Sequence, residues 1–342
     1  MNGAMPRVQF KHSGKETPAD LGEWMYDVAE RCSSGVPFSC KAGACGTCAT
    51  EILEGDENLP KRTARELRTL GEAGVDPARH RLLCLQEVGG DLVFGRPHSA
   101  VEQRTRPAVR DAVVEAYRPL NLTVAEVRFF VPDGTLSFKP GQFMIFQIPD
   151  TTKLVRRSYS ISTPPSDKDH FEVCVRAVAG GYGSNWVHRL RPGDRVKVEG
   201  PHGKFVLDDA SDREILMIAT GTGMSPIKSM LLHLLDTGSR RRVRLFFGVR
   251  HESDLFYTDL FRGLSAHYPE FHPTITLSSP DPTRWAGPHG RVTELVRQHV
   301  TAADAARTDV YLCGGREMID ACKQLLLERG FAKESLHHEN FY

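Results

Sequence analysis

The chain has 342 residues, a length that predicts two or three domains, each large enough to bury its own core. Its 44 Lys and Arg residues nearly balance its 43 Asp and Glu residues, and 25% charged with 40% hydrophobic residues is ordinary for a soluble protein. The length excludes a disulfide-stapled miniprotein. The net charge of +1 gives no indication of nucleic acid or an anionic membrane as a partner.

No targeting or membrane-spanning segment is recognisable in the sequence. No stretch approaches the roughly 18 consecutive apolar residues of a spanning helix, and residues 1–10 lack the apolar centre of a secretory signal. We therefore expect a cytoplasmic protein without a membrane anchor. In that reducing compartment its eight cysteines, several of them clustered, indicate a metal centre before a disulfide.

Residues 1–96 predict a small α+β domain. Its expected elements are, in order, a strand at 8–10, a helix at 21–31, a cysteine-rich loop and a strand at 49–53. Residues 97–107 include two prolines and show no hydrophobic periodicity, which is typical of a linker. A domain boundary is therefore expected there.

Residues 108–210 predict an antiparallel β-barrel domain. Short strand-like runs are separated by turn signals, and they lie at 112–116, 122–131, 143–148, 158–162, 171–178 and 195–199. Several short strands at this spacing favour a barrel over a layered α/β fold.

Residues 211–342 change to alternating strands and helices. The expected segments are 215–219, 227–235, 243–248, 274–277, 292–299, 310–313 and 317–329. Alternation of this kind predicts a parallel, doubly wound sheet with helices on its faces. The third domain is therefore expected to be α/β.

Four cysteines show the spacing of a plant-type 2Fe-2S site: Cys40, Cys45, Cys48 and Cys84. The first three form C-x4-C-x2-C, and the fourth follows much later in the chain. Each iron of such a cluster needs two thiolates, and a glycine-rich loop lets backbone amides approach the sulfides. Gly43 and Gly46 lie where that close approach is required.

A structural zinc site is the alternative for these cysteines, since zinc also accepts four thiolates. Zinc ribbons favour paired C-x2-C knuckles, whereas this chain has one x4 gap and one distant partner. Cys32 and Cys322 fall on helical patterns and Cys174 on a strand pattern, so we expect these three to be small core residues.

The barrel region carries polar residues suited to a flavin nucleotide. They are Arg157, Ser158, Tyr159 and Ser160, then Val175 and Arg176, then Gly181, Gly183 and Ser184. A tyrosine on a strand can lie on a flavin, an arginine can neutralise a phosphate, and a Gly-Ser turn opening a helix can direct amides at a pyrophosphate. Each signal is weak alone, because Arg-Ser-Tyr-Ser also suits an ordinary exposed strand.

A glycine turn follows the buried strand 215–219 and precedes a helix. Its residues are Gly221, Thr222 and Gly223, with Pro226 in the first turn of the helix, and this geometry binds phosphates. It is not the full G-x-G-x-x-G, because Pro226 stands where the third glycine would be. Cys313 and Gly314 end a later strand, at the sheet edge where α/β folds bind ligands.

The order of these motifs resembles that of the NADH-dependent reductase components of bacterial oxygenases, over about residues 8–342. The resemblance implies a β-grasp 2Fe-2S ferredoxin domain, an FAD-binding barrel and a nicotinamide domain. It also implies that residues matching Arg157, Tyr159 and Ser160 hold the flavin, and that Gly181 and Ser184 approach its pyrophosphate.

For the nicotinamide domain, the resemblance implies that Gly221, Thr222 and Gly223 contact the dinucleotide and that Cys313 lies beside the nicotinamide. We expect Cys313 to pack and polarise rather than act as a nucleophile, the alternative being a buried strand-end cysteine. Arg250 and Asp254 lie in a stretch that resembles the nucleotide-facing strand end.

The chain's last residues include Glu339, Phe341 and Tyr342 and resemble the flavin-side terminus of the family. Either aromatic residue is a candidate to cover the isoalloxazine. An ordinary frayed terminus is the alternative. We expect the catalytic residues to be Cys313, Tyr159 and Ser160.

The activity implied is electron transfer from NADH through FAD and the 2Fe-2S cluster to a separate protein, with an oxygenase component expected as acceptor. A deoxysugar dehydratase or a corrinoid protein would suit the same modules, and a redox-sensing or zinc-stabilised binding protein is the non-enzyme alternative. Residues 277–280 lack an arginine cluster for a 2′-phosphate, although Arg284 is near, so NADH is favoured with NADPH left open. A monomer is expected.

Overall fold

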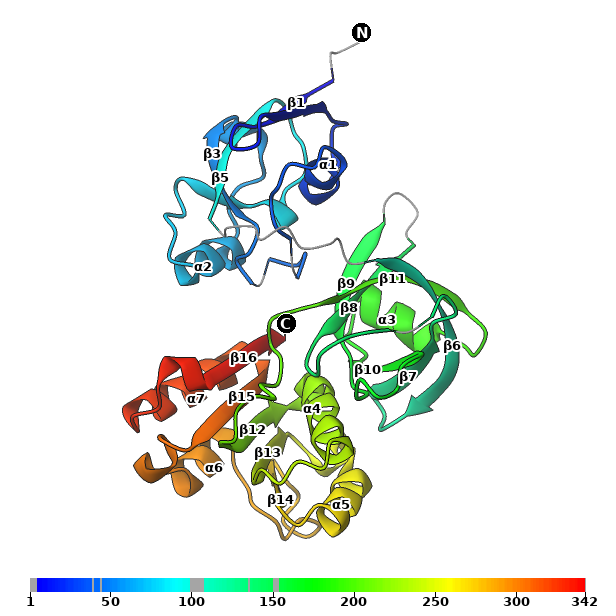
Figure 1. The fold of residues 1–342 in the computed structure, drawn as a ribbon, viewed down its shortest axis with the longest axis vertical. Coiled ribbons are helices and arrows are strands. Elements are labelled where there is room, and N and C mark those ends of the chain that lie inside the picture. The colour runs from blue at the N-terminus through cyan, green and yellow to red at the C-terminus, as the bar shows by residue number, and fades with distance from the viewer. Residues whose placement is uncertain are drawn as a thin grey trace. The chain divides into compact units, whose positions relative to one another are not determined.

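The structure is a computed structural model that describes residues 5–38, 40–43, 45–98, 108–134, 136–149 and 154–341. Residues 99–107 of the expected linker and the candidate flavin residue Tyr342 lie outside the described residues. The chain forms two compact units, Met1–Pro107 and Ala108–Tyr342. The described residues form three β-sheets, one in the first unit and two in the second (Figure 1).

The first unit contains a five-stranded mixed sheet in the order β2-β1-β5-β3-β4. Its elements are β1 (Arg7–Phe10), β2 (Lys15–Pro18), α1 (Met25–Arg31), β3 (Ala49–Glu54), α2 (Ala64–Glu72), β4 (His80–Leu82) and β5 (Leu92–Pro97). Strands β1 and β5 run parallel, and the other neighbours are antiparallel. Buried Phe10 and Phe94 stack at the centre of a core that also includes Met25 and Leu70. This is the ferredoxin-type α+β domain.

Several features of this unit differ from the sequence-based expectation, which did not include strands β4 and β5. The helix expected from residue 21 begins at Met25, because Trp24 is extended and bridges Glu87. Helix α2 was not expected. The side chain of Thr63 caps it by accepting a hydrogen bond from the Glu66 N–H.

The second unit begins with a six-stranded antiparallel sheet in the order β10-β7-β6-β11-β8-β9. Its elements are β6 (Val109–Pro119), β7 (Val124–Phe130), β8 (Phe143–Ile148), β9 (Val155–Ser160), β10 (His170–Arg176), α3 (Tyr182–Arg189) and β11 (Arg195–His202). A bridge between Ile161 and Val173 joins the two edge strands, which closes the sheet into the expected barrel. Alternate inward residues such as Phe129, Phe146 and Phe171 fill it.

The rest of the second unit is a five-stranded parallel sheet in the order β14-β13-β12-β15-β16. Its elements are β12 (Glu214–Thr220), α4 (Met224–Asp236), β13 (Val243–Val249), α5 (Thr258–His267), β14 (Phe271–Leu277), α6 (Val292–His299), β15 (Thr308–Gly315), α7 (Arg316–Glu328) and β16 (Leu336–Phe341). Strands β12 and β13 are apolar and almost wholly buried because helices cover both faces of the sheet.

Helix α4 begins at Met224, three residues before the expected start, and Pro226 lies in its first turn. The alternative of a frayed terminus is wrong for Leu336–Phe341, which form β16 and pair in parallel with β15.

Single-turn 3₁₀ helices lie at Asp56–Asn58, Leu83–Leu85, Gly221–Gly223, Glu252–Asp254, Ala302–Asp304 and Lys333–Ser335. Among the described residues, no helix has the length and apolar character to cross a membrane.

Candidate functional site

The four cysteines of the C-x4-C-x2-C motif and its distant partner lie together in the first unit. Cys40, Cys45 and Cys48 belong to the loop before β3, and Cys84 lies in the 3₁₀ turn Leu83–Leu85. The Cys45 thiol interacts with that of Cys40, and the Cys84 thiol with those of Cys40 and Cys48. The Gly43 N–H donates a hydrogen bond to Cys84 Sγ at 3.2 Å.

This crowding of thiols fits an iron cluster. Hydrogen bonds of the protonated Cys84 thiol with Cys40 and Cys48, together with burial, raise its pKa well above the usual range, and Cys40 raises the pKa of Cys45. Thiolates at this site therefore require positive charge beside them, which two irons supply. No group of three or more His, Cys, Asp or Glu side chains in the described ranges is placed to hold a metal ion, but each iron of a 2Fe-2S cluster takes only two thiolates.

Glycine is required in the cysteine loop by both conformation and space. Gly43 has φ +73°, and a Cβ there would lie 2.6 Å from Leu85 Cδ1. Gly46 has φ +70°, and its Cβ would lie 3.0 Å from that of Ala73. The Thr69 hydroxyl of α2 donates to the Gly43 carbonyl at 3.0 Å, so α2 holds the loop in this close approach.

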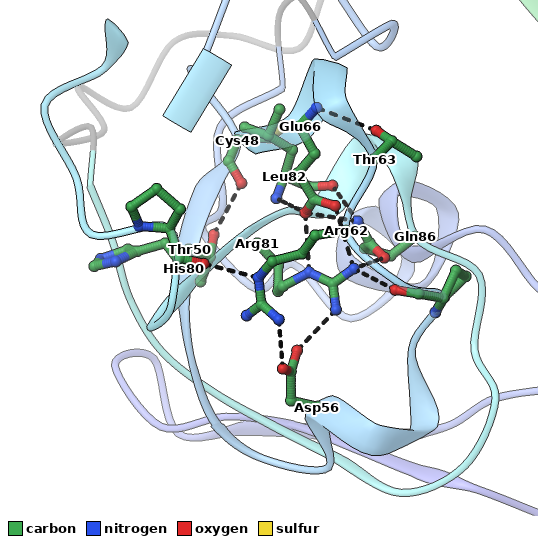
Figure 2. Close-up of polar contacts among 12 residues, drawn as sticks. Cys48, Thr50, Asp56, Arg62, Thr63, Glu66, His80, Arg81, Leu82 and Gln86 are labelled. Carbon is green, nitrogen blue, oxygen red and sulfur yellow. Dashed lines mark hydrogen bonds and ion pairs between the residues drawn. The ribbon is translucent and has the colours of Figure 1, made fainter. Parts of the chain in front are cut away.

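A buried ion network holds the turn that carries Cys84 (Figure 2). Arg81, 1% exposed, donates through Nε to Glu66 at 2.9 Å and through its terminal nitrogens to Asp56 at 2.7 Å and Gln86 at 2.8 Å. Glu66 in turn accepts from the Leu82 N–H at 3.0 Å, two residues before Cys84. Helix α2 thus fixes both the cysteine loop and the separate turn.

Lys41, next to Cys40, is a site residue that the sequence analysis did not identify. Its backbone is left-handed at φ +48°, and its buried ammonium pairs with Glu30 at 2.8 Å and lies 5.7 Å from the ring centroid of Tyr26. The residue therefore places a positive charge inside the cysteine loop. In the sequence, Lys41 has the character of an ordinary polar loop residue.

The barrel brings most of the expected flavin residues to one place, where β9 meets the start of α3. Arg157, Ser158, Tyr159 and Ser160 lie on β9. Gly181 caps α3, and Gly183 and Ser184 form its first turn. A Cβ at Gly183 would lie 2.7 Å from Arg157 Cγ and 3.1 Å from Tyr159 Oη, so glycine allows the helix to approach the strand.

Ser160 and Cys313 lie on different sheets and both interact with Glu339. The Ser160 hydroxyl donates to Glu339 Oε2 at 3.2 Å, and Cys313 pairs in register with Glu339 across β15 and β16. Burial and the Glu339 charge raise the pKa of the Cys313 thiol well above its usual range. The thiol is therefore neutral near pH 7. Glu339 was absent from the expected site residues, although the Glu-x-Phe of the terminus was its signal.

A cleft of about 710 Å³ opens at the carboxyl ends of β12, β13 and β15. The expected residues that line it are Arg176, Gly221, Thr222, Arg250, Asp254, Gly314 and Phe341. Other lining residues add cationic and hydroxyl groups, among them Ser278, Arg291 and Arg316. The cleft thus combines the glycine turn, a set of cations and an aromatic ring in one place.

Four expected residues are not among those that line this cleft: Gly223, Cys313, Val175 and Pro226. Gly223 and Cys313 are packed together, because a Cβ at Gly223 would lie 2.3 Å from the Cys313 carbonyl oxygen. Val175 and Pro226 are buried. The side chain of Asp254 accepts from the His251 N–H at 3.0 Å and closes the turn after β13.

Three family models match the chain in sequence. The 2Fe-2S iron-sulfur cluster binding domain matches residues 8–88, the oxidoreductase FAD-binding domain matches residues 112–207, and the oxidoreductase NAD-binding domain matches residues 217–324. Their order along the chain is the order of the three sheets.

Similar proteins share this whole arrangement. The propane 2-monooxygenase reductase component of Rhodococcus jostii is 30% identical over 355 residues, which cover 98% of this chain and 91% of that relative. The phenol 2-monooxygenase reductase component DmpP of Pseudomonas sp. is 29% identical, covering 98% and 94%. The crystal structure of the Amycolatopsis cytochrome P450 reductase GcoB superposes with a TM-score of 0.72 at 25% identity, covering 98% of each chain.

The domain models and the full-length relatives agree with the thiol loop, the barrel site and the cleft. The chain belongs to the family of oxygenase reductase components, flavin iron-sulfur oxidoreductases that carry electrons from NADH through FAD and a 2Fe-2S cluster.

Proposed function

We propose that this chain supplies electrons from NADH to an oxygenase component. The observation that carries the proposal is the meeting of Ser160 from the barrel with Glu339 and Cys313 from the parallel sheet, beside the nucleotide cleft. Two full-length relatives are named as reductase components of monooxygenases, which supports an oxygenase as the acceptor.

The chemistry is supplied by the cofactors, since FAD takes an electron pair from NADH and releases single electrons that the cluster passes on. The chain's own residues bind and orient these groups. We assign Cys40, Cys45, Cys48 and Cys84 as the cluster ligands, because their thiols lie together and the amide of Gly43 already donates to one of them.

We assign the FAD site to the strand β9 and the start of α3. Arg157 supplies a cation for the phosphates, and the first-turn amides of α3, at Gly183 and Ser184, supply donors. Tyr159 is largely buried, which raises its pKa and keeps its phenol neutral. Ser158, Val175, Arg176 and Gly181 complete the proposed site, and Phe341 or Tyr342 is proposed to cover the isoalloxazine.

We assign NADH to the cleft of the parallel sheet. Gly221, Thr222 and Gly223 form the phosphate turn, with Pro226 shaping the helix behind it and Gly314 opening space across the sheet edge. We assign Arg250 and Asp254, which line the cleft in the segment after β13, to the adenosine end of NADH. Cys313 acts as a neutral packing group and Ser160 as a hydroxyl held by Glu339.

Three further features belong to this proposal. The domain limits are 1–96 for the ferredoxin domain, 97–107 for the linker, 108–210 for the FAD domain and 211–342 for the NAD domain. We propose a monomer that works in the cytoplasm, where NADH is available and clustered thiols stay reduced. The chain is proposed to meet its acceptor through the ferredoxin domain.

The absorption spectrum of anaerobically purified protein, followed by titration with NADH, tests the proposal. Flavin bands on a broad iron-sulfur envelope, bleaching in two stages on titration, are expected. Cytochrome c then serves as a general one-electron acceptor. A colourless protein that retains zinc would refute the cluster and the electron-transfer function together.

A further inference from the structure

Helix α4 presents a buried polar face. Ser225, Lys228 and Ser229 are spaced at i, i+3 and i+4, so their side chains lie on one side of the helix. All three are buried, and Lys228 is only 5% exposed. A lysine at this depth is rare unless its charge is paired, so the face has a specific set of partners.

The hydrogen-bond and ion-pair partners of this face all belong to the barrel. The Ser225 hydroxyl donates to the Ser160 carbonyl at 2.8 Å, and the Ser229 hydroxyl donates to the Thr163 carbonyl at 2.5 Å. Lys228 Nζ lies 2.5 Å from Glu126 on β7 and 2.7 Å from Glu172 on β10. Four directional bonds therefore fix the helix to three barrel segments.

Each charged group of the cluster has an oppositely charged partner. Lys228 is shared by two carboxylates, and each carboxylate has a second cation, Arg118 beside Glu126 and Arg128 at 3.3 Å from Glu172. Burial favours the neutral form of Glu126, but Lys228 and its hydrogen bonds hold its pKa below the usual range. The paired, charged state is the one that persists, and its bonds require one relative placement of helix and barrel.

Tyr257, the residue before α5, also contacts this cluster. Its backbone is left-handed at φ +61°, a sparsely populated conformation for an aromatic residue. This conformation directs its buried hydroxyl to donate to Glu126 and places its ring 5.1 Å from Lys228 Nζ. The segment before α5 is thus joined to the same carboxylate as α4.

The elements that this cluster joins adjoin or carry residues that line the cleft assigned to NADH. Helix α4 follows directly on the glycine turn Gly221–Gly223, and on the barrel side β7 begins at Val124 and β10 ends at Arg176, both of which line the cleft. Strand β9 ends at Ser160, whose carbonyl accepts from Ser225. A shift of α4 would therefore move the phosphate turn relative to the flavin strand.

We propose that the polar face Ser225-Lys228-Ser229 sets the placement of NADH against the flavin, with Lys228 as a positioning residue for the reduction of FAD. This inference rests on the proposed function. It extends that function to residues that do not line the cleft and that act through the barrel segments they bond. Because a displacement of about 1 Å costs a reaction of this kind up to about 100-fold, the cluster is expected to act on rate more than on binding.

The test is anaerobic stopped-flow reduction of the full-length holoprotein by NADH. In Lys228→Met two carboxylates face each other without the shared cation, and we expect the limiting rate of flavin reduction to fall by about tenfold or more while the Kd for NADH changes by less than about threefold. Lys333→Met, the same change at an exposed position, is the matched control and is expected to match the wild type.

A second variant separates positioning from stability. Lys228→Met with Glu126→Gln also removes the charge of the buried carboxylate that has lost its buried cation, so its thermal midpoint is expected to recover toward the wild type while the slow flavin reduction remains. Ser229→Ala removes one bond and is expected to give a smaller rate loss with an unchanged midpoint. If Lys228→Met does not fold, the rate of flavin reduction and the Kd for NADH of Ser229→Ala test the inference in its place.

A folded Lys228→Met or Ser229→Ala protein that reduces flavin at the wild-type rate would overturn the inference. So would a double variant whose rate recovers together with its thermal midpoint, because that result would show a stability role alone. A wild-type protein whose flavin NADH does not reduce would instead refute the proposed function, and the two failures are therefore distinguishable.

Discussion

At the scale of single residues, the carboxylate of Glu339 interacts with two other residues of the candidate site. Glu339 accepts a hydrogen bond from Ser160. Burial raises the pKa of Cys313, and the negative charge of Glu339 raises it further. The hydroxyl is thereby oriented and the thiol is kept protonated. Both groups are thus neutral, fixed dipoles, which suits positioning rather than acid-base chemistry.

Ser160→Ala tests the value of this orientation. The change removes one hydrogen bond to a charged acceptor, worth about 1.5 kcal/mol, and we expect the rate of flavin reduction to fall by about tenfold. The fold should persist because Ala fits the strand. Stopped-flow reduction by NADH and a thermal midpoint measure the two effects. An unchanged rate would remove Ser160 from the site.

Gly223→Ala tests the close approach behind the phosphate turn. The added Cβ would lie 2.3 Å from the carbonyl oxygen of Cys313, a contact with backbone that no rotamer relieves. We expect a loss of about 1–3 kcal/mol of stability and weaker NADH binding, measured by denaturant unfolding and by titration.

The control for this variant is Gly263→Ala in α5, where an ideal Cβ meets no described atom within 4 Å. It is expected to raise stability by about 0.5–1 kcal/mol, since alanine favours a helix. Equal effects of the two substitutions would show that the approach of Gly223 to Cys313 does not constrain the turn.

At the scale of elements, apolar periodicity predicted the parallel sheet and the barrel but not α2. The buried residues of that helix are Glu66, Thr69 and Leu70, so only one apolar side chain faces the core. Its one sequence signal was the capping pattern of Thr63 and Glu66. The polar network that buries Glu66 involves residues up to 25 positions apart, and no local pattern specifies it.

The strand β16 was missed for a related reason. Its sequence, Leu336-His-His-Glu-Asn-Phe341, has neither a β-branched run nor a clean alternation, and its extended form comes from pairing with β15. The cysteine ligand spacing and the glycine turn were predictable because their chemistry depends on short-range spacing. The meeting of Ser160, Glu339 and Cys313 was not, because it requires two sheets to pack.

Arg81→Met tests the network of α2. It leaves Glu66 buried without its main cation, and breaking a buried pair in this way costs about 3–5 kcal/mol. We expect the purified protein to lose iron and its iron-sulfur absorbance, since Glu66 also holds the Leu82 amide before Cys84. Arg79→Met, which breaks an exposed pair with Glu51, should cost less than about 1 kcal/mol and keep the iron.

Two histidines make β16 sensitive to pH. Burial lowers the pKa of His337 and of His338 below the usual 6.5. The unfolded chain therefore takes up protons before the folded chain does, so stability is complete above pH 6.5 and falls as the pH drops below it. In His337→Phe the ring can still stack on Tyr311, at 4.7 Å in the wild type, but does not titrate.

We expect His337→Phe to lose less thermal stability than the wild type between pH 7 and about pH 5, measured as the midpoint at each pH. Below that range Glu126 and Asp304, whose pKa values are held low by their cations and hydrogen bonds against the effect of burial, destabilise both proteins alike. Parallel curves through the whole range would exclude His337 as the titrating group.

At the scale of the whole molecule, the limits of the hydrophobic cores differ from the limits of the proposed binding sites. The barrel and the parallel sheet share one core, in which Val124 and Cys174 of the barrel pack with Met217 and Phe247 of the sheet. The limit proposed between residues 210 and 211 therefore separates binding sites but not folding units. The first unit has a separate core of its own. The cysteines assigned to the cluster therefore lie in one unit, and the residues assigned to FAD and NADH lie in the other.

Cys84→Ser tests this division. Serine is a poorer ligand than a thiolate for iron, and the 3₁₀ turn that carries residue 84 offers no other cysteine, so the variant is expected to lose the cluster and cytochrome c reduction. NADH should still bleach the flavin at the wild-type rate, because the assigned FAD and NADH residues all lie in the second unit. Iron content, visible spectra and stopped-flow kinetics on one preparation measure the three effects. If flavin reduction fails as well, the two units do not work as separate modules, and the cluster must support the structure of the flavin site.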